Sequence, residues 1–155
     1  MKINNDNLFI HIQKQADTVV KDFLSENGID TKDNEGRTAI INAAFYNNTK
    51  LLKWLIENGA DINKRDSIGF SALHFACQEG HMESVKILLD NEPNVNLVDN
   101  YGNTPAWVTI MNWRGGENFP ILKMLYKNGA DLTIRNNSGN SAIDIIPQNI
   151  LDQLK

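Results

Sequence analysis

A chain of 155 residues with 41% apolar and 22% charged side chains is long enough to bury one core without disulfides or metals, and too apolar to be disordered. Its formal net charge is -4, and its 15 basic residues are scattered among 19 acidic ones. A nucleic-acid binder normally carries a basic stripe, because phosphate contacts supply much of its affinity. We therefore expect a single domain that binds no nucleic acid.

The cysteine content and the N-terminus bear on the compartment. Cys77 is the one cysteine, so an internal disulfide is excluded and a reducing compartment is the natural setting. The first residues lack the apolar run and cleavage site of a signal peptide, and no stretch approaches the roughly 18 consecutive apolar residues of a membrane span. These features predict a cytoplasmic protein with no membrane partner.

Residues 1–32 are predicted to form a diverged first helical unit that caps the N-terminal end, with Phe23 and Leu24 where later units carry paired leucines. From residue 33 the chain is periodic, since one glycine recurs every 33 residues and the last interval is four residues longer. These glycines are Gly36, Gly69, Gly102 and Gly139. A fixed period of this length is the signature of a repeat architecture.

Each of these glycines belongs to a turn that leads into a helix. An acidic or amide residue lies three positions before it and bonds the backbone of the turn, while glycine adopts a positive φ at low cost. A Thr or Ser two positions after it is predicted to cap the next helix, its hydroxyl accepting from a free backbone amide. The capping residues are Thr38, Ser71, Thr104 and Ser141, and Pro105 follows Thr104 at the first helical position.

Two short helices are predicted between successive turns. Small residues on the first helix let the pair approach closely, and leucines on the second bind each unit to its neighbour. In the unit 33–65 the two buried stripes are formed by Ile40, Ala43 and Ala44 and by Leu51, Leu52, Leu55 and Ile56.

The unit 99–135 departs from this pattern by four extra residues between its helices, around Trp113. A tolerated loop insertion explains the added length, because loops absorb residues at low entropic cost. The alternative is a protruding element that touches a partner, which an exposed Trp113 favours. The segment 136–155 is predicted to be a truncated C-terminal cap, because Pro147 interrupts its helix.

These residues resemble the ankyrin repeat, whose pattern runs Asp-x-x-Gly-x-Thr-Pro-Leu-His, then Ala-Ala, Gly-His, Val-x-x-Leu-Leu and Gly-Ala-Asp. The best match is DSIGFSALHFACQEGHMESVKILLD, residues 66–90. The resemblance covers almost the whole chain and implies an all-α fold: an ankyrin-repeat solenoid of helix-turn-helix units joined by β-hairpin loops, with diverged N- and C-terminal caps. We expect one domain over 1–155, with a cap or diverged repeat at 1–32, repeats at 33–65, 66–98 and 99–135, and a cap at 136–155.

No set of residues indicates catalysis, a cofactor or a metal. The resemblance places His74 and His81 at structural positions, where the ring bonds backbone between units, and Cys77 is expected to be an inert buried thiol. His11 stands alone and is expected to pack or to face solvent. No Cys/His cluster has metal-site spacing, and no phosphate loop or nucleophile motif occurs, so an enzyme is not expected.

In ankyrin-like stacks, as the resemblance implies, a partner contacts the hairpin tips and the outward positions of each first helix, which line a concave surface. Large apolar residues occupy these places here, and aromatic residues and Met are enriched at protein interfaces. Ile68, Phe70 and Tyr101 are predicted to form a contiguous exposed patch, whereas Phe45 and Phe75 have the alternative of packing against neighbouring helices. The predicted partner-binding residues are Arg37, Tyr46, Ile68, Phe70, Phe75, Tyr101, Asn103, Met111 and Trp113.

We therefore expect a non-enzymatic module, monomeric when unbound, that binds another protein through its concave face as an inhibitor, adaptor or regulator. Small stand-alone members of the family include bacterial immunity proteins that neutralise a cognate toxin, a role that the resemblance also admits. The alternative is a structural element that self-assembles through the same aromatic patch.

Overall fold

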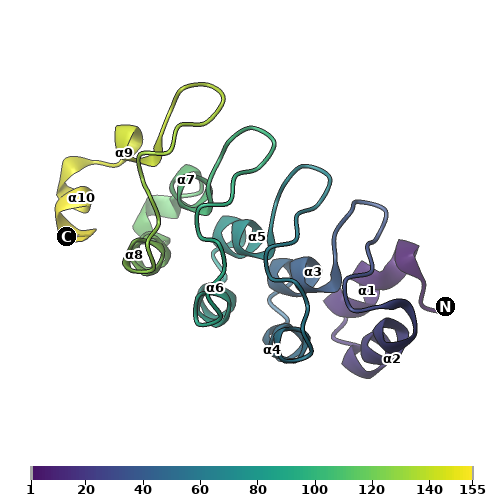
Figure 1. Ribbon diagram of the computed structural model, residues 1–155. Helices are drawn as coiled ribbons and strands as arrows, with labels where there is room; N and C mark the ends of the chain where they lie inside the picture. Colours follow the sequence, from purple (N-terminus) through teal and green to yellow (C-terminus); the bar gives the residue numbers. More distant parts are fainter. Residues whose placement is uncertain (1, 155) are drawn as a thin grey trace.

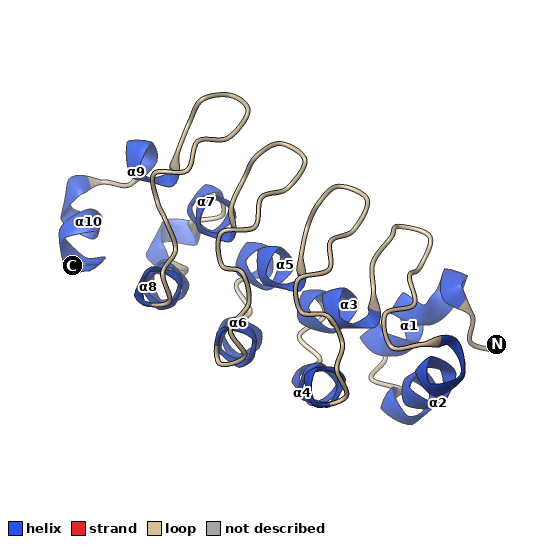
Figure 2. Cartoon of the chain, viewed as in Figure 1, coloured by secondary structure: helices blue, strands red, loops and turns tan. Residues whose placement is uncertain are grey.

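The computed structural model describes residues 2–154, apart from the side chain of residue 114, and they form short helices joined by turns and loops (Figure 2). Two short 3-10 turns, η1 (Asn5–Asn7) and η2 (Arg114–Gly116), accompany the α-helices. The α-helices are α1 (Leu8–Gln13), α2 (Asp17–Asn27), α3 (Ala39–Phe45), α4 (Thr49–Glu57), α5 (Ala72–Glu79), α6 (Met82–Leu89), α7 (Pro105–Met111), α8 (Phe119–Lys127), α9 (Ala142–Ile145) and α10 (Gln148–Leu154).

The helices stack in two rows along an elongated array (Figure 1). The inner row, α1, α3, α5, α7 and α9, lies beside the hairpin loops, and the outer row, α2, α4, α6 and α8, lies on the opposite side. Successive inner helices pack on one another, as α3 does on α5 and α5 on α7. This arrangement is the all-α solenoid that the sequence predicts.

The core lies between the two rows. The small residues of the inner helices, such as Ala43 and Ala76, are fully buried, so the helices approach one another closely. The leucines of the outer helices, such as Leu52 and Leu88, are also fully buried and fill the space between units. Burying side chains of this size is the main favourable term in the stability of the stack.

The predicted helix caps are confirmed in two units and wrong in a third. The Ser71 and Thr104 hydroxyl oxygens accept from the backbone amides three residues on, at 3.4 Å and 3.2 Å. The Thr38 hydroxyl is buried and has no hydrogen-bond partner. Ser71 also contacts Nδ1 of His74 at 2.9 Å, whereas Ile41, at the matching position after Thr38, has no polar side-chain atom.

Each hairpin loop is closed by the acidic or amide residue that begins it. In the hairpin 66–71, Asp66 Oδ1 accepts from the amides of Ile68 and Phe70 at 3.0 Å and 2.8 Å. The matching residues of the other hairpins accept the same pair of bonds. The two sides of this loop meet in one antiparallel pair, Arg65 with Ser71, and residues 2–154 contain no extended strand.

Neighbouring hairpin tips are joined by backbone hydrogen bonds of 2.8–3.2 Å. The bonds run from Ser67 N to Glu35 O, from Asn100 N to Ile68 O and from Asn137 N to Tyr101 O. Gly69 permits this contact, because its φ is +87° and a Cβ built on it would lie 2.7 Å from Asn100 N. We call these three backbone hydrogen bonds between neighbouring tips the ladder, and they set the spacing of the tips.

The C-terminal unit ends as Pro147 predicts. α9 has four residues and stops just before this proline, and the chain then turns into α10. Leu154 of α10 is buried, and Ile150 and Leu151 pack against the core. α10 thus packs against the last repeats, and a capping role for this segment stays a prediction.

Candidate partner-binding surface

Among the large apolar side chains of the hairpin loops and inner helices, Ile68 is exposed at 44%, Tyr101 at 65% and Met111 at 61%, and Ile143 and Ile145 of α9 are exposed at 38% and 41%. Ile68 and Tyr101 hold the same position on consecutive tips, which the bond from Asn100 N to Ile68 O joins at 3.0 Å. Met111 is the last residue of α7. We call the hairpin loops and inner helices the concave face, and Ile68, Tyr101 and Met111 the concave patch.

Phe70, the third member of the predicted exposed patch, is partly buried in an aromatic cluster. Its ring stacks on His74 with a centroid distance of 5.1 Å and meets Phe75 edge-on at 5.0 Å. Phe75 meets Phe45 at 5.2 Å, and Phe45 meets Tyr46 at 4.8 Å. Because Phe75 is only 3% exposed, its prediction as a partner-binding residue was wrong, and its packing against neighbouring helices is confirmed.

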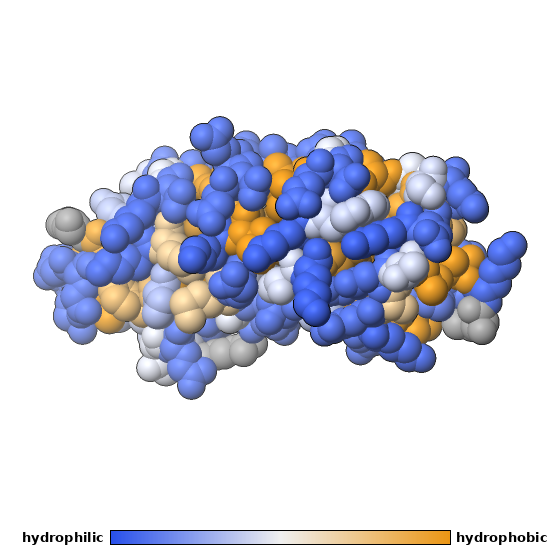
Figure 3. Space-filling view, turned by 90° about the horizontal axis from the view of Figure 1, so that it is seen from below, coloured by the Kyte–Doolittle hydropathy of each residue, from blue (hydrophilic) through white to orange (hydrophobic). Residues whose placement is uncertain are grey.

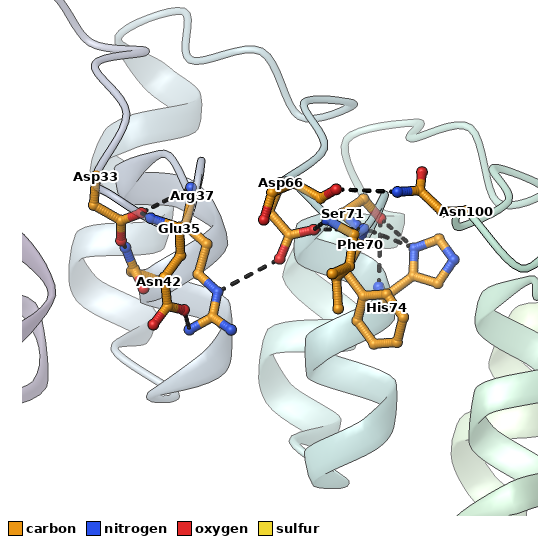
Figure 4. A network of polar contacts seen from close by, with 11 residues as sticks. Asp33, Glu35, Arg37, Asn42, Asp66, Phe70, Ser71, His74 and Asn100 are labelled. Carbon is orange, nitrogen blue, oxygen red and sulfur yellow. Dashed lines mark hydrogen bonds and ion pairs between the residues drawn. The ribbon is translucent and has the colours of Figure 1, made fainter.

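Arg37 lies against this cluster and joins the hairpin 33–38 to the hairpin 66–71 (Figure 4). Its Nη1 is 2.8 Å from Glu35 Oε2, and its Nε is 3.5 Å from Asp66 Oδ2. The guanidinium lies 4.7 Å from the Phe75 ring centroid and 5.4 Å from that of Phe45. Its charge is already paired within the chain, so Arg37 is a structural bridge more than a free charge at the rim.

Tyr46 follows α3 at the edge of the aromatic cluster and is partly buried. Burial raises the pKa of its phenol above the usual 10, and the nearby Arg37 charge opposes that shift. The hydroxyl is therefore neutral near neutral pH and able both to donate and to accept a hydrogen bond.

The side chain of Asn103 is bonded within the hairpins. Its Nδ2 donates to Asp99 Oδ2 and its Oδ1 accepts from Asn136 Nδ2, both at 2.9 Å. Its backbone carbonyl lies 3.1 Å from His74 Nε2. Because the Ser71 amide donates to Nδ1 at 3.2 Å, the neutral His74 ring carries its proton on Nε2 and donates it to Asn103. Asn103 thus fixes the hairpin base before any partner binds.

Trp113 does not protrude, so the prediction of an exposed loop tryptophan was wrong. Its ring is partly buried against the core and meets Phe119 edge-on at 6.3 Å. The insertion folds as the short turn η2, in which Gly115 and Gly116 adopt positive φ angles of 67° and 101°. These angles turn the chain from α7 towards α8 and leave Trp113 beneath the turn.

The histidines and the cysteine take the predicted structural roles. His74 contacts Asn103 O in the next unit at 3.1 Å, and His81 Nδ1 contacts Ala44 O in the preceding unit at 3.2 Å. Burial lowers the pKa of His74 below 6.5 and raises the pKa of the Cys77 thiol to about 12. In the described part of the chain no three His, Cys, Asp or Glu side chains are placed to hold a metal ion, and no helix is long and apolar enough to cross a membrane.

Lysines are distributed unevenly between the two faces. The outer helices α4, α6 and α8 carry exposed lysines: Lys50, Lys53, Lys86, Lys123 and Lys127. The inner helices α3, α5, α7 and α9 and the hairpin turns 33–38, 66–71, 99–104 and 136–141 contain no lysine. Hydrophilic residues cover most of the outer face, with some hydrophobic surface between them (Figure 3). Among these helices and turns, lysine is thus confined to the outer face.

Comparison with known families agrees with this architecture. The family model for ankyrin repeats in many copies matches residues 9–56, 42–89 and 73–106, which together cover more than half of the chain. The chain belongs to the ankyrin-repeat family. Ankyrin repeats generally mediate protein–protein interaction, and the family is typically a non-enzymatic interaction module.

Several relatives share the repeat. A putative ankyrin repeat protein, FPV031 of Fowlpox virus (strain NVSL), is 29% identical over 153 residues, covering 93% of this chain and 44% of the viral protein. BCL-6 corepressor-like protein 1 of Homo sapiens is 30% identical over 113 residues, 72% of this chain and 6% of that protein. Protein phosphatase 1 regulatory subunit 27 of Mus musculus is 28% identical over 109 residues, 68% of this chain and 71% of that protein. This ankyrin-repeat chain spans less than half of the first two.

Proposed function

We propose that this ankyrin-repeat protein regulates another protein by binding it through the concave patch and blocking or tethering it by occupancy alone. The observation that carries the proposal is the exposure of Ile68, Tyr101 and Met111 among hairpin turns and inner helices (α3, α5, α7 and α9) that contain no lysine. Aromatic residues and Met are enriched at protein interfaces, whereas Lys is depleted. The outer face carries exposed lysines, although Met82 and Tyr126 are exposed among them.

The concave patch is supported by a preorganised scaffold. Ile68 and Tyr101 sit on tips closed by the carboxylates of Asp66 and Asp99, and the ladder holds these tips together. Side chains that are already fixed lose little entropy when a partner binds, so more of the contact energy appears as affinity.

Two relatives are named as a regulatory subunit and a corepressor-like protein, which favours a regulatory role over a purely structural one. Such a module needs neither a cofactor nor a catalytic group. An immunity protein is the narrower case in which the regulated partner is a toxin.

The experiment is affinity capture from a lysate of the source cell, quantified by mass spectrometry, with three forms of the chain. The test variant is Tyr101→Ala/Met111→Ala on the concave face. The matched control is Tyr126→Ala/Met82→Ala, which removes the same residue types, also exposed, from the outer helices α8 and α6. Circular dichroism verifies that all three forms are folded.

We expect a partner that the wild type and the control capture and that the test variant loses by at least about tenfold, since two interface anchors carry more than 1.4 kcal/mol. Equal capture by the test variant, or loss with the control, contradicts the proposal. Light scattering of the purified chain tests self-assembly separately, because the proposed role requires a monomer in the absence of the partner.

A further inference from the structure

A small apolar pocket lies between the end of α7 and the end of α9. Its volume is about 250 Å³, and it is lined by Ile110 and Trp113 on one side and by Ile145, Ile146 and Pro147 on the other. Of the residues that the structure describes, none with a charged side chain lines it. We call it the terminal pocket.

The terminal pocket exists because the last inner helix is short. The helices α3, α5 and α7 have seven, eight and seven residues, whereas α9 has four. Ala44 and Cys77, at the register of Ile110 in the two preceding units, are fully buried in a stack where the next inner helix packs on each of α3 and α5. Beyond Ile145, α9 has no further turn to cover the end of α7. The pocket therefore marks the place that another apolar group would fill in a full-length repeat.

The size and lining of the pocket select its occupant. An apolar cavity of about 150 Å³ holds a benzene molecule, and small-molecule sites usually start at about 300 Å³. A volume of about 250 Å³ therefore suits one large side chain and is small for a cofactor. A polar or charged occupant would give up its hydration without gaining a partner, which is unfavourable.

The terminal pocket adjoins the concave patch. Ile110 precedes Met111 directly in the chain, and Ile145 on the other wall is itself 41% exposed. Because consecutive Cα atoms are about 3.8 Å apart, a protein that contacts Met111 lies within one residue of the pocket wall. The other large hollow, at the N-terminal end, is lined in part by Lys2, Asp22 and Glu26, and water suits it better than an apolar group.

We propose that the terminal pocket accepts one aliphatic or aromatic side chain of the partner protein as an anchor beside the concave patch. This inference rests on the proposed function, because the anchoring side chain belongs to the protein that binds the concave patch. A site of this kind excludes water around one buried side chain, which is the arrangement that makes interface anchors strong.

The test begins with single-residue probes on the full chain: N-acetyl-leucinamide, N-acetyl-phenylalaninamide and N-acetyl-lysinamide, each titrated while the isoleucine methyl signals are followed by NMR. We expect the leucine and phenylalanine probes to shift the methyl signals of Ile110, Ile145 and Ile146 saturably, and the lysine probe to leave them unchanged. Ile145→Asp, which charges the pocket mouth, abolishes the shifts. The matched control is Ile143→Asp, because Ile143 lies on the same helix with 38% exposure and does not line the pocket.

The proposal is overturned if no probe gives a saturable shift, if the lysine probe acts equally, or if Ile145→Asp and Ile143→Asp behave alike. Methyl shifts that depend on protein concentration without any probe would show that a second copy fills the pocket, which also overturns it. With a captured partner, Ile145→Asp should weaken binding at least tenfold and Ile143→Asp should not. Binding that needs Tyr101 and Met111 but tolerates Ile145→Asp would overturn the pocket assignment and leave the proposed function standing.

Discussion

Replacing Gly69 with alanine tests whether neighbouring hairpin tips are in direct contact. The φ of Gly69 is +87°, and the left-handed region costs an L-residue about 1–2 kcal/mol. The new Cβ would also lie 2.7 Å from Asn100 N and 2.9 Å from Asp99 C, which are backbone atoms that no rotamer change can move away. Overpacking of this kind costs about 1–3 kcal/mol, so we expect a total loss of about 2–5 kcal/mol in the free energy of unfolding.

Gly139 provides the matched control in the last hairpin. Its φ is +79°, nearly the same as that of Gly69, but a Cβ there would meet no atom within 4 Å. Gly139→Ala should therefore lose only the backbone term of about 1–2 kcal/mol. The assay is urea unfolding followed by far-UV circular dichroism, with the thermal midpoint as a second measure that shifts by about 2–4 °C per kcal/mol at this chain length.

The difference between the two variants isolates the contact between tips. We expect Gly69→Ala to be less stable than Gly139→Ala by about 1–3 kcal/mol, which is the overpacking term alone. Equal losses would refute the reasoning, because they would mean that the tips of the hairpins 66–71 and 99–104 do not touch. The spacing of Ile68 and Tyr101 in the concave patch would then have no support from the ladder.

Two further substitutions test local features of the stack. Burial lowers the pKa of His74, so as pH falls through 6.5 the unfolded chain takes up a proton that the folded chain refuses, and the free energy of unfolding should fall. Between about pH 7 and pH 5, above the range in which most carboxylates protonate, His74→Gln should show a smaller slope in chemical denaturation, and an unchanged slope would count against this reading. Glu92 holds a φ of 51° where the matching units carry Gly59 and Gly129, so Glu92→Gly should raise the free energy of unfolding by about 1 kcal/mol, and a loss would contradict the assignment of strain.

The fold is predictable from the sequence because its signals are local and repeated. Asp66, Gly69 and Ser71 each act within a few residues, through an Asx turn, a positive φ and a helix cap, and the same chemistry returns at a fixed interval. Pro147 acts locally too, since it stops α9 at the expected place. The failed cap at Thr38 has no counterpart in the sequence, because Thr104 forms the cap and the spacing of the turn residues is the same at both positions.

The candidate site is predictable only where exposure follows from register. Tip residues such as Ile68 and Tyr101 point away from the stack, and their exposure agrees with that position. Phe75 occupies a position treated as outward, but its counterparts Asn42 and Val108 are buried as well. The structure gives a reason in Asn42, whose Nδ2 reaches under the hairpin to Asp33 Oδ2 at 2.9 Å. The position is buried in each of these units, so the register rule was wrong there.

Trp113 and the terminal pocket depend on contacts between segments that sequence spacing does not bring together. Trp113 is partly buried against Phe119 across the turn η2, and it lines the pocket in which Ile110 lies opposite Ile145 of another unit. The signal that points to the pocket is Pro147, since a shortened last helix leaves the preceding one uncovered. Pro147 thus indicates two features, the end of α9 and the uncovered surface at the end of α7.

The second and third units differ in whether their buried polar side chains form hydrogen bonds, and this difference bears on where a partner binds. Among the described residues, buried side-chain atoms without a hydrogen-bond partner are His11 Nε2 in the first unit and Thr38 Oγ1, Asn42 Oδ1 and Arg37 Nε in the second, the last of which lies 3.5 Å from Asp66 Oδ2. A buried polar group left unsatisfied costs about 1–3 kcal/mol, so Thr38 and Asn42 lower the stability that polar contacts give the second unit. In the matching region of the third unit, Ser71 Oγ contacts His74 Nδ1, and His74 Nε2 contacts Asn103 O, so these buried polar atoms have partners. Each unit of a solenoid contacts only its neighbours, so polar contacts act locally, and Ile68 of the concave patch lies on the third unit. A partner that binds at Ile68 therefore meets a hairpin whose hydrogen bonds are already formed, which lowers the entropy cost of binding.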